Sequence, residues 1–139
     1  MKYSKKGNNY TLCIEKGEKI IETLAGFAAK KGIKNGFFSG IGGAHKAEIG
    51  FYDENLKKYI TKKYEGALEI VNITGNIAVM DGKQVIHAHI TLGREDYSIV
   101  GGHLMEAVAA PVCEISLVKF DGEVRRELDE KTGLKSLKL

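Results

Sequence analysis

Residues 68–92 read LEIVNITGNIAVM-DG-KQVIHAHITL, two β-rich runs joined by Asp81-Gly82. An Asp-Gly pair is typical of a two-residue type I′ turn, and a loop of that length fixes which residues of the two strands lie opposite each other. Counting outward from the turn therefore predicts five opposed pairs, Met80 with Lys83, Ile77 with Ile86, Asn76 with His87, Thr74 with His89 and Ile73 with Ile90.

This register separates the hairpin into two faces, because directly opposed residues share a face of the sheet. We expect the apolar face to lie in the core and the histidines to lie on the polar face. The apolar face contains Ile73, Gly75, Ile77, Ile86, Ala88, Ile90 and Leu92. The polar face contains Asn72, Thr74, Asn76, His87, His89 and Thr91.

Three of the four histidines lie close together in the sequence, in His87-Ala88-His89 and in Gly101-Gly102-His103. A His-x-His pair on a strand places both imidazoles on one face, and His103 follows a glycine pair that lets the chain close over that face. The pattern predicts a metal site of His87, His89 and His103. Three imidazoles suit Zn²⁺, although Ni, Co, Mn or Fe fits the same donors. The alternative is that these histidines are ordinary residues satisfied by hydrogen bonds.

Other residues are weaker candidates for this site. Glu114, on the strand after Pro111, is a candidate general acid or base if its face meets the histidines, and otherwise a partly exposed carboxylate. Arg94 could hold a substrate carboxylate, and Glu95 and Asp96 could reach the metal, although loop carboxylates are mostly solvated. We expect His45 to have a core or interface role rather than to be a fourth ligand.

The remaining pattern predicts one long helix and several strands. From Glu18 the apolar residues recur every three or four positions up to Lys31, and Gly32 is placed as the C-terminal cap. Alternation predicts strands at 10–15, 36–40, 44–53, 57–65 and 112–120, a glycine-rich turn at 41–43 and one or two helical turns at 104–109. We therefore predict the α+β (α/β) class, with one main helix packed on a largely antiparallel sheet.

Length and composition set limits on the class of protein. A chain of 139 residues predicts a single domain over residues 1–139. Charged residues make up 28% of the chain and the net charge is +3, but the lysines and arginines are scattered and form no concentrated basic patch. No apolar run approaches the ~20 residues of a membrane span, and no signal-peptide core follows Met1, so we expect a cytoplasmic protein. Cys13 and Cys113 lack the spacing of a zinc or redox motif.

The motifs together resemble one known family. Their order resembles the plants-and-prokaryotes conserved (PPC) domain over nearly the whole chain. The matching segments are Ser39-Gly40-Ile41-Gly42, residues 47–53, Gly75-Asn76-Ile77, Asp81-Gly82, His87-Ala88-His89, Gly101-Gly102-His103-Leu104, Cys113-Glu114 and Thr132-Gly133-Leu134. The resemblance implies a homotrimer in which His87, His89 and His103 bind a divalent metal, usually zinc. The Arg-Gly-Arg-Pro AT-hook of plant members is not in this sequence.

Three functions follow from these observations. The first is a trimeric metalloprotein whose open zinc position binds a small oxygen-bearing molecule and, as a zinc-dependent lyase or hydrolase, transforms it. The second is a DNA-binding or transcription-associated protein, as the family resemblance suggests. The third is a structural trimer module stabilised by its metal. We favour the first and keep DNA binding as the alternative.

Overall fold

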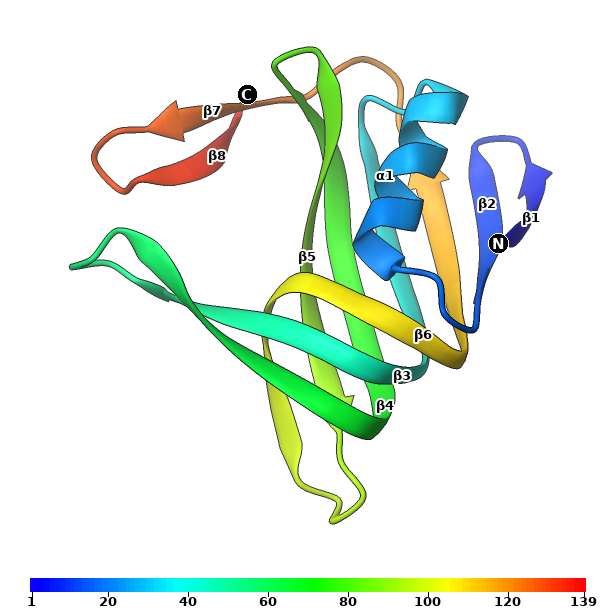
Figure 1. Ribbon diagram of the computed structural model, residues 1–139. Coiled ribbons are helices and arrows are strands. Elements are labelled where there is room, and N and C mark those ends of the chain that lie inside the picture. The colour runs from blue at the N-terminus through cyan, green and yellow to red at the C-terminus, as the bar shows by residue number, and fades with distance from the viewer.

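The computed structural model describes all residues, 1–139, and consists of eight strands and one helix (Figure 1). In chain order the elements are β1 (Lys2–Lys6), β2 (Asn9–Glu15), α1 (Ile20–Lys31), β3 (Gly36–Asp53), β4 (Lys58–Met80), β5 (Lys83–Gly93), β6 (Ile99–Lys119), β7 (Arg125–Asp129) and β8 (Leu134–Lys138). No helix of the chain combines the length and the apolar character that a membrane span requires.

The prediction of an α+β class is wrong, because the protein is predominantly β. The predicted glycine turn at 41–43 lies inside β3, and the predicted helical turns at 104–109 lie inside β6. The helical turns were predicted because β6 has a register shift where it pairs with Glu48 and Ile49 of β3. A bulge adds one residue to the alternation. The spacing from buried Leu104 to buried Ala107 is therefore three, as it would be on a helix.

Long bent strands allow the sheet to close on itself. β3 pairs with β4, β4 with β5, β5 with β6, and β6 returns to β3, so four strands form a closed cycle of antiparallel pairings. β1 and β2 extend the sheet from β6. The β7–β8 hairpin joins β4 through a single parallel pair, Val79 with Arg125, and projects from one side of the molecule (Figure 1).

The hairpin register predicted around Asp81-Gly82 is confirmed at all five predicted pairs, from Met80 with Lys83 to Ile73 with Ile90. Five of the seven residues on the apolar face of the hairpin belong to a buried core of 25 residues, and Ile86 packs against that core. Helix α1 contributes Ile20, Leu24 and Phe27 to the same core. The histidine-bearing face is thus left free of the core.

Helix α1 begins and ends for different reasons. At its C-terminus Gly32 is left-handed (φ 59°), and its N–H and that of Ile33 both donate to Ala28, which confirms the predicted glycine cap. At its N-terminus Lys19 makes no capping hydrogen bond. Glu106 of β6 instead accepts hydrogen bonds from the backbone N–H groups of Ile21 (2.8 Å) and Glu22 (3.2 Å).

Glycines in β3 allow a close approach to β6. A Cβ on Gly40 would lie 2.4 Å from the carbonyl oxygen of Glu114, and one on Gly43 would lie 2.2 Å from that of Ala110. No side chain fits at these distances, so the glycine-rich segment serves strand packing within a continuous strand rather than a turn.

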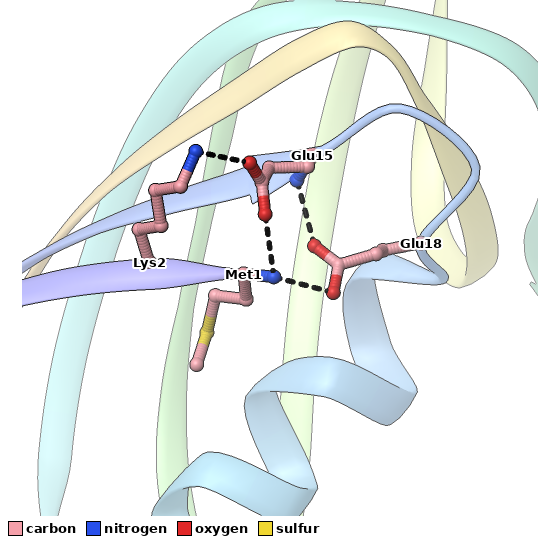
Figure 2. A network of polar contacts seen from close by, with 4 residues as sticks. All are labelled: Met1, Lys2, Glu15 and Glu18. Carbon is pink, nitrogen blue, oxygen red and sulfur yellow. Dashed lines mark hydrogen bonds and ion pairs between the residues drawn. The ribbon is translucent and has the colours of Figure 1, made fainter.

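The first residues are held by a polar network (Figure 2). The Met1 α-ammonium group donates to Glu18 (2.6 Å) and Glu15 (3.1 Å), while Lys2 forms an ion pair with Glu15. These contacts raise the pKa of the α-amino group, with the hydrogen bond to Glu18 as the largest cause. The network joins β1 to the segment between β2 and α1.

Candidate metal centre

The three predicted histidines converge on one face of the sheet. His89 on β5 and His103 on β6 are a directly opposed pair, and His87 lies two residues before His89 on the same face. The ring centroid of His87 is 5.3 Å from that of His89 and 5.0 Å from that of His103. One nitrogen of each ring lies within 4.8 Å of the other two. Nitrogens that share a zinc ion are about 3.3 Å apart at bond lengths of about 2.05 Å, so modest rotations bring these to coordination distance.

The chemistry of the donors fits a divalent transition metal. Nε2 of His87 and Nδ1 of His103 are buried and have no hydrogen-bond partner in the chain. Burial lowers the pKa of His103 to about 4 and also lowers the pKa of His87. Both rings are therefore neutral near pH 7, which is the form that binds a metal. The donor set of His87, His89 and His103 thus fits a divalent metal ion.

The aromatic ring of Tyr59 covers one side of the histidine cluster. The ring of Tyr59, from the first part of β4, stacks on the ring of His103 with centroids 4.3 Å apart and planes 21° apart. Gly50 of β3 makes room for this arrangement, because a Cβ there would lie 2.9 Å from the Tyr59 ring. Burial raises the pKa of the Tyr59 hydroxyl group, which therefore remains protonated at neutral pH. Stacking on Tyr59 thus fixes the plane of the His103 ring.

Arg126 of β7 is a site residue that the sequence interpretation missed. Its Nη2 donates to Oδ1 of Asn76 (2.7 Å) and contacts Nδ1 of His87 (3.0 Å), while Nη1 donates to the carbonyl oxygen of Lys135 (2.6 Å). The sequence contains no usable signal for this contact, because Arg125-Arg126 reads as part of a polar tail. Only the parallel pairing of Val79 with Arg125 brings the segment to the histidines.

The other predicted site residues lie outside the cluster. Glu114 is exposed on the histidine-bearing face, but it lies in a part of β6 that β3 and β4 separate from β5. Arg94 and Asp96 form an ion pair in the turn that follows β5, where Glu95 is exposed. His45 is exposed at a register shift of β3, so a core role is wrong for it.

The sequence model of the Plants and Prokaryotes Conserved (PCC) domain matches residues 1–121. Curated proteins give no match.

Three solved structures share the fold over nearly their full lengths. A "putative dna binding protein" from Bacteroides thetaiotaomicron is 33% identical, with 99% of this chain and 96% of that chain covered and a TM-score of 0.95. A metal-containing protein from Archaeoglobus fulgidus is 33% identical, with 98% of each chain covered and a TM-score of 0.87. A plant- and prokaryote-conserved protein from Pyrococcus horikoshii is 31% identical, with 99% and 97% covered and a TM-score of 0.88.

Proposed function

This chain belongs to the Plants and Prokaryotes Conserved (PCC) domain family, and from that premise we propose that it is a metal-binding protein whose three-histidine site takes a small-molecule ligand. The observation that carries the proposal is the convergence of His87, His89 and His103, with their candidate ligand nitrogens within 4.8 Å of one another. The Archaeoglobus relative, which is metal-containing by name, supports it.

We propose Zn²⁺ as the ion, with another divalent transition metal as the variant of the same proposal. Neutral imidazole nitrogens are intermediate between hard and soft ligands and suit zinc. No carboxylate, which would favour a harder ion, belongs to this cluster of three histidines. Three protein ligands leave a tetrahedral ion one position for an outside oxygen, which the ion would polarise. Whether this becomes turnover by lyase or hydrolase chemistry depends on the molecule that binds there.

We further propose that the protein acts as a homotrimer, with DNA binding as the second candidate function. Exposed apolar residues on the histidine-bearing face, Phe37 and Ile41 of β3, support burial of this face between subunits. The name of the Bacteroides relative favours DNA binding. A mobility-shift titration at about 100 mM salt tests the DNA-binding function, because specific DNA recognition requires a complex well below micromolar concentration.

Metal analysis tests the main proposal. Protein purified with zinc supplementation and then dialysed should hold about one zinc per chain, and His103→Ala should hold none. His45→Ala is the matched control, because His45 is exposed and outside the cluster. Zinc absent from the wild-type protein, or equal zinc in His103→Ala and His45→Ala, would overturn the proposal. Light scattering on the same samples tests the trimer.

A further inference from the structure

Arg126 carries a positive charge that no acidic group of the chain compensates. Its guanidinium group is half-buried, and none of the ion pairs of the protein includes it. Its acceptors are neutral, namely a side-chain amide, a backbone carbonyl and the His87 ring, and its buried Nε has no partner. Partly buried charges are normally paired, so this environment lacks an anion.

A metal ion at His87 would release one donor of Arg126. A guanidinium group can only donate hydrogen bonds, so Nδ1 of His87 accepts from Nη2 and the ring proton is on Nε2. If the ion binds Nδ1, the lone pair that accepts this bond is used. If the ion binds Nε2, the proton must move to Nδ1, which then cannot accept. By either route Nη2 loses the His87 acceptor and keeps only Oδ1 of Asn76, while a second positive charge lies nearby.

We propose, resting on the metal site proposed above, that the ligand of this site is a carboxylate-bearing small molecule recognised jointly by the metal ion and Arg126. A carboxylate offers one oxygen to each cation and supplies the negative charge that both lack. The planar guanidinium group matches a carboxylate through donors on neighbouring nitrogens, here Nη2 and the unpartnered Nε. Arg126 is thus a specificity-determining residue that lies beyond the residues matched by the family model.

The competing explanation is that Arg126 only fastens the β7–β8 hairpin, because Nη1 binds the carbonyl oxygen of Lys135 on β8. That role predicts an effect of substitution on stability and none on anion binding. A ligand role predicts a change in anion affinity in protein that still folds and still binds metal. The two explanations therefore differ in a measurable quantity.

The test uses Co²⁺ as a visible spectroscopic probe and acetate as the carboxylate. Full-length wild-type protein, R126M and R126K are titrated with Co²⁺, then with acetate or its neutral isostere acetamide, at constant ionic strength. R125M is the matched control, because Arg125 is the exposed neighbour that pairs with Glu123. Circular dichroism checks the fold of each variant.

We expect acetate, and not acetamide, to change the cobalt spectrum of the wild-type protein. Acetate should bind R126M about tenfold or more weakly, R126K to an intermediate degree, and R125M as the wild type. By linkage, acetate should also raise the Co²⁺ affinity of the wild type more than that of R126M. Equal acetate affinity in folded, cobalt-loaded wild type and R126M would overturn the Arg126 inference alone. Failure of the wild type to bind Co²⁺ or Zn²⁺ would overturn the metal site itself.

Discussion

Replacing Glu106 should destabilise the protein by releasing the start of helix α1 from the sheet. The Glu106 carboxylate does from β6 what a capping side chain does from within a helix, because it accepts from the second and third N–H groups of α1. Loss of such a cap costs about 0.5–2 kcal/mol. Loss of the negative charge at the positive end of the helix adds about 0.3–1 kcal/mol. We therefore expect Glu106→Ala to lower the free energy of unfolding by about 1–3 kcal/mol.

Glu106→Gln separates the two contributions. The amide keeps one acceptor oxygen and loses the charge, so we expect it to recover part of the loss and to fall between the wild type and Glu106→Ala. The assay is urea unfolding of metal-free protein, followed by far-UV circular dichroism at one protein concentration, since association shifts the apparent stability. Glu69→Ala is the control, because Glu69 is an exposed strand carboxylate without a hydrogen bond or ion pair in the structure. If Glu106→Ala and Glu69→Ala unfold at the same urea concentration, the cross-element cap has no energetic role and the reasoning is wrong.

Two further predictions concern backbone packing and pH. Gly40→Ala should destabilise the protein by at least about 2 kcal/mol, because the new Cβ would lie 2.4 Å from the carbonyl oxygen of Glu114. Gly26 on α1 has open space around it, so Gly26→Ala should stabilise the protein by about 0.5–1 kcal/mol. Urea unfolding of both variants measures the two effects. Burial lowers the pKa of His103 to about 4 from 6.5. Between these values the His103 side chain binds more protons in the unfolded chain than in the folded one. Its contribution to the stability of metal-free protein should therefore be fully present above about pH 6.5 and fall as the pH drops toward 4. His103→Asn should flatten this dependence, and an unchanged slope in that variant would contradict the assignment.

The sequence was informative wherever local rules decide the structure. The Asp81-Gly82 turn sets the register of β4 and β5 by its length, and Gly32 ends α1 because it adopts a left-handed conformation. The same rules placed His87 and His89 on one face. The glycine pair before His103 also led us to expect that it would join them. In the structure β6 pairs with β5, which places His103 directly opposite His89.

The errors arose where contacts between distant segments override the local pattern. A bulge in β6 gives residues 104–109 a helical spacing, and β3 remains a strand through its glycines because β6 lies against them. Arg126 reaches the histidines, and Glu106 reaches α1, from segments 39 and 85 residues away along the chain. No periodicity within either segment encodes the partner.

The β7–β8 hairpin meets the rest of the sheet through one backbone pair, yet it brings a guanidinium group to the histidine cluster. Its other polar contacts with the rest of the protein run through the side chains of Tyr52, Lys57 and Arg126, and such contacts can change in evolution without altering the backbone pairing of the sheet. Homologous chains could thus retain the three histidines and carry different C-terminal segments beside them. Their ligand preference would then change with little effect on folding.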